Sequence, residues 1–247
     1  MFMADRPIHR FSPDGVEMEM DDLAEEVVIT IYCDDEVVVR ILATPSDLED
    51  LAIGHIACEC RGTIDSSRVE GNSVYLSGSV LKRPSGDLLT AACGACTEGE
   101  IEDVDVKVDN KFQLGIDPYV LCNEMRGLQP VFSATGGVHA AALANSQQVV
   151  LVREDIGRHN AVDKVIGAAI TAKLDPSEHC LILSGRIGWE LVAKAARVGI
   201  ELMISVGAVS TAAADLARSC GMTLVGFTSE GKGVVIGPTS RIIDKLN

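Results

Sequence analysis

The first half of the chain combines a few strand-like runs with one helical stretch. Period-two runs of β-branched and apolar residues predict strands at 27–32 and 37–42, joined by a turn at Asp34-Asp35. A helix is predicted from Leu48 to Cys60, where apolar residues recur at helical spacing after the start signal Pro45-Ser46-Asp47. This half therefore indicates a small α+β unit.

The rest of the first half has weaker patterns. Shorter strands are expected at 74–76 and 104–108, and the segment 82–102 between them is interpreted as a loop because its periodicity is weak. Residues 1–22 are interpreted as a flexible acidic tail. We therefore place the N-terminal α+β region at 23–130.

The second half alternates short apolar runs with helical patterns, and Gly199 and Gly221 stand where helices would end. Its strands are expected at 149–152, 180–183, 202–205 and 223–226, and its helices at 161–174, 190–198 and 211–219. Alternation of this kind is typical of a mainly parallel, layered sheet. We therefore predict an α/β fold, with a C-terminal layered α/β domain over 131–247.

Composition restricts the class of protein further. No apolar run approaches the roughly 18 residues of a membrane span, and the N-terminus lacks the apolar stretch of a signal peptide. We therefore expect a cytoplasmic protein, in which the eight cysteines are free thiols, metal ligands or redox groups rather than structural disulfides.

The formal net charge is −15, and it is unevenly distributed. Residues 1–130 contain 10 basic and 26 acidic side chains, whereas residues 131–247 contain 11 basic and 10 acidic ones. An acidic first half without basic, aromatic-rich runs argues against nucleic-acid binding. The nearly neutral second half can accept an anionic ligand.

Polar and glycine residues cluster after the predicted strands of the second half. In open α/β sheets, ligands bind outside the carboxyl ends of the strands, where helix N-termini favour anions. Neither G-x-G-x-x-G nor G-x-x-x-x-G-K-[ST] is present, so a nucleotide would be held in another way. Arg158, His159, Arg186 and Lys232 are the candidate phosphate partners.

The segment Cys93-Gly94-Ala95-Cys96 is a C-x-x-C pair with several interpretations. A zinc site needs about four ligands, yet a second C-x-x-C is absent, and Cys58 and Cys60 would point to different faces of a helix. A zinc deaminase needs H-x-E upstream, but His55 and His139 are each followed two residues later by alanine. We therefore predict no metal site.

The other interpretations concern the thiols themselves. A thioredoxin-type pair is expected beside a βαβ unit, and acidic neighbours such as Glu98 and Glu100 would raise thiol pKa values. A sulfur carrier needs one thiol to hold a persulfide and a second to assist its release, on a slim loop that can reach a partner. An unreactive thiol pair remains the alternative.

Several segments together resemble the FdhD family, the sulfur carriers that serve formate dehydrogenase. The resemblance extends from about Glu25 to Ile236. The matching segments are Thr44-Pro45-Ser46-Asp47, the C-x-x-C pair, Thr135-Gly136-Gly137-Val138-His139-Ala140-Ala141, Glu154-Asp155-Ile156-Gly157-Arg158-His159-Asn160-Ala161-Val162-Asp163-Lys164 and Ser184-Gly185-Arg186.

This resemblance implies that a cysteine desulfurase loads a persulfide onto Cys93, with Cys96 as its partner. The sulfur would then pass to the molybdenum (or tungsten) bis-guanine-dinucleotide cofactor for formate dehydrogenase. It further implies a homodimer, and a second domain with a cytidine-deaminase-like fold but without zinc chemistry. The implied cofactor contacts, for which a guanine nucleotide would be a mimic, are Phe227, Thr228, Ser229, Glu230, Gly231 and Lys232.

The chain departs from the family pattern at two places. Thr97 follows the second cysteine where the family has glycine, and Thr228-Ser229-Glu230 stands where the family has an arginine. The alternative to sulfur transfer is a cofactor-binding chaperone that uses no sulfur chemistry. His139 and His159 could tune a thiol or bind phosphate, or could be buried, hydrogen-bonded histidines.

Overall fold

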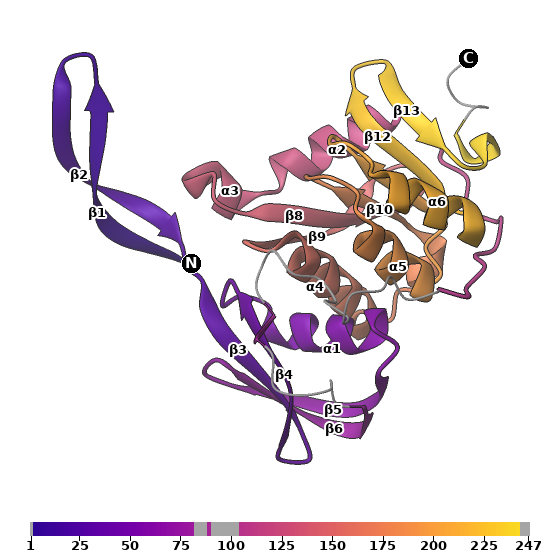
Figure 1. Ribbon diagram of the computed structural model, residues 1–247, viewed down its shortest axis with the longest axis horizontal. Coiled ribbons are helices and arrows are strands. Elements are labelled where there is room, and N and C mark those ends of the chain that lie inside the picture. The colour runs from indigo at the N-terminus through magenta and orange to yellow at the C-terminus, as the bar shows by residue number, and fades with distance from the viewer. Residues whose placement is uncertain (1, 82–87, 90–103, 243–247) are drawn as a thin grey trace.

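The computed structural model describes residues 2–81, 88–89 and 104–242 (Figure 1). These residues form one six-stranded sheet, one five-stranded sheet and a separate two-stranded hairpin, with helices packed on both larger sheets. The α/β class expected from the sequence is confirmed.

The N-terminal sheet has the strand order β5-β6-β3-β4-β7 within the described residues. Helix α1 (Leu48–Cys58) covers this sheet, and Leu51 and Ile56 pack with Ile29 and Ile31 in its core. Strands β3, β4 and β6 and helix α1 confirm the predictions, whereas β5 is missing from them. The strands are β3 (Val27–Cys33), β4 (Glu36–Ala43), β5 (Gly62–Glu70), β6 (Ser73–Val80) and β7 (Leu88–Leu89).

The C-terminal sheet has the order β13-β12-β11-β10-β8-β9 in the part of the chain that is described. Strands β10, β11 and β12 are parallel, and β8, β9 and β13 are antiparallel to their neighbours. The prediction of a mainly parallel sheet is therefore wrong, because hairpins add strands at both sides of a parallel centre. The strands are β8 (His139–Ala144), β9 (Val149–Asp155), β10 (Cys180–Leu183), β11 (Leu202–Ser205), β12 (Thr223–Ser229) and β13 (Lys232–Ile236).

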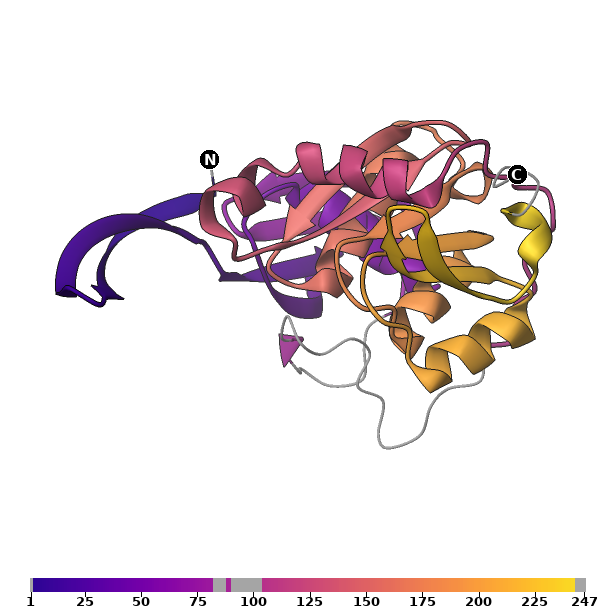
Figure 2. The ribbon, with the colours of Figure 1, turned by 90° about the horizontal axis from the view of Figure 1, so that it is seen from above.

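Helices cover both faces of this sheet (Figures 1 and 2). Side chains that alternate along β8 separate two cores: Ala141 and Leu143 pack with α4, α5 and α6, whereas Ala140 and Ala142 pack with α2. The helices are α2 (Pro118–Gly127), α3 (Pro130–Thr135), α4 (Arg158–Thr171), α5 (Trp189–Arg197) and α6 (Thr211–Cys220), with short 3-10 turns at Pro176–Glu178 and Thr239–Arg241.

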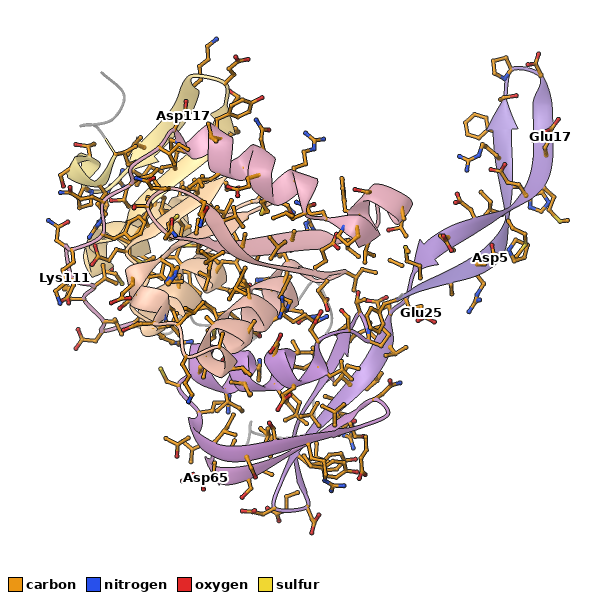
Figure 3. All side chains as sticks on the ribbon, turned by 180° about the vertical axis from the view of Figure 1, so that it is seen from behind. Asp5, Glu17, Glu25, Asp65, Lys111 and Asp117 are labelled. Atoms are coloured by element: carbon orange, nitrogen blue, oxygen red, sulfur yellow. The ribbon has the colours of Figure 1, made fainter. Side chains whose placement is uncertain are left out.

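Residues 104–130 belong with the C-terminal sheet, although the sequence assigns them to the N-terminal region. Val104 and Val106 pack against the core of α4, α5 and α6, and Phe112 and Leu121 lie in the core beneath α2. The strand predicted at 104–108 is absent, because this described segment crosses the core without pairing as a strand. Figure 3 places Lys111 on this segment and Asp117 where α2 begins.

The predicted tail, residues 1–22, is instead a β-hairpin. Strand β1 (Met3–Ser12) pairs with β2 (Gly15–Ala24) in an antiparallel ladder that extends away from the rest of the molecule (Figure 1). Apolar Val16, Met18 and Met20 alternate with acids in β2, which is the period of a strand. This alternation indicates a strand, but the many acidic residues of the segment led to the prediction of a flexible tail.

The two sheets are joined by an unusually close contact between α1 and α4. A Cβ atom added to Gly54 would lie 1.7 Å from the carbonyl oxygen of Asp163, and one added to Gly167 would lie 1.9 Å from that of Asp50. Only glycine permits two helix backbones to approach this closely. The crossing therefore fixes α4, whose N-terminus lies at the candidate site.

Candidate functional site

The candidate site lies at the edge of the C-terminal sheet where the parallel strands end. His139 begins β8 opposite Asp155, the last residue of β9. Ser184 directly follows β10 and accepts a hydrogen bond on Oγ from the backbone N–H of Ala140 at 2.9 Å. The turn after β11 packs against this loop, where Ser205 Oγ donates to the carbonyl oxygen of Gly185. This is the edge at which the sequence predicts a ligand.

Two arginines and a histidine meet at this edge. The pKa of His139 is lowered from its usual value of 6.5, first by burial and then by the positive charges of Arg158 and Arg186. The imidazole also packs on Gly185, where an added Cβ would lie 3.2 Å from Nδ1. The charges of Arg158 and Arg186, two of the predicted phosphate partners, therefore both act on His139, in a field that favours anions.

Helix α4 adds its N-terminus to the same place. Gly157 is its N-cap residue and Arg158 its first helical residue. A glycine cap supplies no side chain to the free N–H groups, so the partial positive charge of the 14-residue helix faces the site. The helix N-terminus and the two guanidinium groups are all positively charged, so each attracts an anion.

His159 is buried in the first turn of α4, with 4% of its surface exposed. Its Nε2 lies 2.7 Å from Oε2 of Glu190 on α5, and this hydrogen bond lowers the pKa of the Glu190 carboxyl. The other ring nitrogen, Nδ1, has no hydrogen-bond partner among the described residues. His159 is thus a buried, hydrogen-bonded histidine that keeps one nitrogen unused.

The segment from Phe227 to Lys232 joins β12 to β13 at the end of a β-hairpin. Phe227 has a left-handed φ of 52°, and the β12–β13 register shifts between Gly226 and Ser229. This bulge exposes the Phe227 ring and buries Thr228. The Oγ1 atom of Thr228 has no hydrogen-bond partner within the described part of the chain.

Two cavities meet at Thr228. One has a volume of about 500 Å³ and lies between α2, α3 and the end of the sheet; Thr228, Ser229, His139 and Ser184 are part of its lining. The other has a volume of about 360 Å³ and is lined by Thr228, Gly231 and Lys232 among others. Phe227 and Glu230 line neither cavity, so the predicted cofactor segment is divided between two surfaces.

Comparison with known proteins identifies the family. The model of the FdhD/NarQ family matches residues 24–243. The chain belongs to the FdhD/NarQ family. It is 37% identical to the "Sulfur carrier protein FdhD" of Nocardia farcinica (strain IFM 10152), over 91% of this chain and 89% of the relative. It is 32% identical to that of Staphylococcus aureus (strain MRSA252), over 97% and 96%.

A solved structure has the same fold as this FdhD/NarQ chain. It is described as a candidate formate dehydrogenase accessory protein from Desulfotalea psychrophila, and it superposes with a TM-score of 0.81. The match covers 98% of this chain and 100% of the other, at 22% identity. Similarity at this level establishes the fold.

The FdhD-like motif from Glu154 to Lys164 divides into two roles. Arg158 and His159, in its middle, lie at the N-terminus of α4. Asp155 and Lys164 instead form a fully buried ion pair, with Oδ2 and Nζ 2.7 Å apart. Asp155 Oδ2 also accepts a hydrogen bond from the Thr44 N–H at 3.0 Å, and Lys164 donates to the Thr44 carbonyl oxygen at 3.0 Å. Half of this motif therefore fastens the N-terminal sheet to α4.

A second buried cluster reinforces this fastening. Lys194 Nζ lies 2.8 Å from Asp163 Oδ1 and 3.0 Å from Glu59 Oε1, and His55 Nδ1 lies 3.2 Å from Asp163 Oδ2. Burial opposes ionisation, but Lys194 and His55 hold the pKa of Asp163 below its usual value. These residues join α1, α4 and α5 rather than face a ligand.

The cysteines separate into inert and candidate reactive groups. Cys93 and Cys96 lie outside the described residues. Burial raises the pKa of Cys33 and Cys58 and raises those of Cys122 and Cys180 to about 12, so these thiols stay protonated. Cys122, Cys180 and Cys220 are buried, and among the described cysteines only Cys60 is exposed.

The described residues contain no group of three or more His, Cys, Asp or Glu side chains that could hold a metal ion. Nor does any helix in the described ranges have the length and apolar character needed to cross a bilayer.

Sequence reasoning missed the α2–α3 side of the site. Gln129, Phe132 and Arg126 line the larger cavity, yet none belongs to a motif that the sequence singles out. Pro118 and Pro130, each at the start of a helix, are the signals that could have located α2 and α3.

Proposed function

We propose that this chain accepts a sulfane sulfur on Cys93 from a cysteine desulfurase and passes it to the molybdenum bis-guanine-dinucleotide cofactor for formate dehydrogenase. The observation that carries the proposal is the C-x-x-C pair in a chain whose curated relatives are named sulfur carrier proteins. The inert state of the buried cysteines supports it, because they cannot supply the thiolate that sulfur transfer needs.

The loading and release steps balance in atoms and electrons, and an external dithiol reduces the disulfide that they leave before the next transfer. The Cys93 thiolate attacks the terminal sulfur of the donor persulfide, so one S–S bond forms as another breaks and the donor leaves as a thiolate. The Cys96 thiolate then attacks the inner sulfur of the Cys93 persulfide. This step forms a Cys93–Cys96 disulfide and releases hydrosulfide, so the two thiols lose the electrons that the sulfane sulfur gains.

The cofactor is the sulfur acceptor in this proposal, and the described site has the chemistry to hold its anionic part. The positive charges of Arg158, the first residue of α4, and of Arg186 both act on His139, and charge-assisted bonds from arginine suit phosphate groups. Thr228 offers an unpaired buried hydroxyl beside two cavities. The acid Glu230 lines neither cavity, so it need not repel the ligand.

The remaining expectations follow from the same proposal. We propose that the chain acts in the cytoplasm as a homodimer and delivers its sulfur to a formate dehydrogenase maturation complex. Its strongly acidic N-terminal half disfavours nucleic acid, whereas its nearly neutral C-terminal half can accept a small anionic ligand.

A cofactor-binding chaperone is the second candidate, since the anion site at His139, Arg158 and Arg186 is built without any cysteine. The two are separated by measuring activation of apo formate dehydrogenase with the double variant Cys93→Ala/Cys96→Ala. The sulfur-carrier proposal predicts loss of activation, with Cys60→Ala as the matched control that keeps it. Full activation by the double variant would instead establish the chaperone.

A further inference from the structure

The β1–β2 hairpin (Met3–Ala24), called the arm below, has one apolar face. The strand register places Phe11 opposite Val16 and Met18 opposite His9, and Met20 follows at the same spacing. These side chains therefore point to one side of the ladder. Phe11 is 84% exposed, and Val16, Met18 and Met20 are each more than half exposed. A row of large apolar side chains thus stands in solvent.

The opposite face of the arm is charged. Arg10 lies on this face and forms ion pairs with Glu19 and Asp21 of the facing strand. A sheet with ion pairs on one side and apolar side chains on the other is typical of a sheet whose apolar side is covered. The apolar face is therefore the side of the arm that a partner would contact.

The arm receives little support from its own protomer. In the described residues its two strands pair only with each other, and the arm extends from a root beside α3 (Figure 1). At this root an added Cβ atom on Gly137 would lie 3.4 Å from the Cβ atom of Ala24. Isolated two-stranded hairpins are only marginally stable in water, and extended apolar patches mark interaction sites. The arm therefore needs a surface outside its own protomer.

The area of the apolar face indicates which partner supplies that surface. Two strands of 10 residues each present a face of roughly 300 Å². One arm laid on a foreign protein would bury roughly 600 Å² in total, which is the size of a non-specific contact. Two arms exchanged about a two-fold axis would bury roughly 1,200 Å², at which specific interfaces begin. A second copy of this chain therefore fits the arm better than a different protein does.

A receiving surface lies close to the root of the arm. Leu128, where α2 ends, and Phe132, on α3, are exposed apolar residues four positions apart. When two arms lie antiparallel about a two-fold axis, the tip of each arm reaches the root of the other. Phe11 and Val16, which flank the turn at the tip, would then meet this patch without burying a charge.

We propose that two copies of this chain exchange their arms, so that Phe11 and Val16 of each arm pack on the partner's Leu128 and the partner's Phe132. The inference rests on the homodimer of the proposed function, to which it assigns an interface. Because Phe132 also borders the candidate site, each arm tip would lie beside the site of the other protomer.

Sedimentation velocity of the full chain tests the arm. Wild-type protein should sediment as a dimer, and Val16→Glu should weaken dimerisation about ten-fold or more, because it places a carboxylate in the interface. Val69→Glu is the matched control, since it makes the same change at an exposed strand position of β5, and it should dimerise like wild type. Both positions are exposed, so neither variant should have a lower melting temperature.

Leu128→Glu tests the receiving surface and should weaken dimerisation to a similar extent. Dimers that persist in Val16→Glu, or in Leu128→Glu, would overturn the arm exchange alone. A monomeric wild-type chain would overturn the homodimer of the proposed function as well. Neither result bears on whether Cys93 accepts sulfur, which is measured separately.

Discussion

Individual side chains at this site are set by burial and by their charged neighbours. His139 loses solvent and faces two guanidinium groups, so the imidazole is held neutral at pH 7. His159 is held by Glu190 instead. Two histidines within one site thus have different partners, and an arriving anion would act first on His139, which stands among the positive charges.

The electrostatic origin of this neutral state can be tested by substitution. Arg186→Ala should raise the pKa of His139 toward its usual 6.5, because one of the charges that disfavour the imidazolium is gone. Arg218→Ala, on the exposed surface of α6, is the control and should leave that pKa unchanged. NMR titration of the imidazole signals measures both; equal pKa values in the two variants would show that Arg186 does not act on His139.

For individual residues, the sequence predicts the chemical character of the site better than it predicts where each side chain lies. Arg158 and Arg186 lie at one edge because they follow β9 and β10, which end at the same edge of the sheet on either side of β8. The motif letters could not reveal that Asp155 and Lys164 are buried beneath the N-terminal sheet, since their partner Thr44 lies more than 100 positions away in the chain. Thr228 was placed on a loop, because a strand that bulges has no distinct periodicity.

The contact between helices α1 and α4 requires glycine on both helices. Both helices have a glycine where the backbone of the other passes, and both of these approaches are closer than a Cβ atom permits. The contact holds the N-terminal end of α4 in position for the ligand site.

Alanine at these glycines should therefore be costly. Gly54→Ala and Gly167→Ala should each destabilise the fold by about 2 kcal/mol or more, because α1 and α4 must separate to admit a methyl group. Gly127→Ala, at the end of α2 in open space, is the matched control and should be neutral or slightly stabilising. Urea denaturation measures the three free energies of unfolding; three equal values would contradict the close crossing.

Hydrophobic patterns correctly predict the strongly apolar elements. The predicted strands 180–183 and 202–205 coincide with β10 and β11, because both are uniformly buried. The hairpin β1–β2 was not predicted, because most of its apolar side chains are exposed and acidic residues are frequent in β2. The helices α2 and α3 were missed, although Pro118 and Pro130 stand where these helices begin.

The whole molecule depends on buried charge between its two sheets. The pair Asp155–Lys164 joins β9 and α4, and three further hydrogen bonds of the pair reach Thr44 and Ser46 of the N-terminal region. Unpaired charges in such a place are strongly unfavourable, whereas the complete pair with its hydrogen bonds is tolerated.

A double-mutant cycle at this pair tests the connection. Asp155→Asn or Lys164→Met alone should cost about 3–5 kcal/mol, because each leaves an uncompensated buried group. The double variant should cost clearly less than the two single costs combined. Chemical denaturation followed by fluorescence of Trp189 gives the energies. Additive costs would show that the two side chains do not act as a pair.

Whether Cys93 carries sulfur is decided by peptide mapping with mass spectrometry. The protein is incubated with a cysteine desulfurase and cysteine, digested and mapped. The account predicts the added mass of one sulfur atom on the peptide containing Cys93, absent in Cys93→Ala and retained in Cys60→Ala. Two results would contradict sulfur transfer through Cys93. One is wild-type protein without the added sulfur atom, and the other is a Cys93→Ala variant that carries the sulfur atom at Cys60.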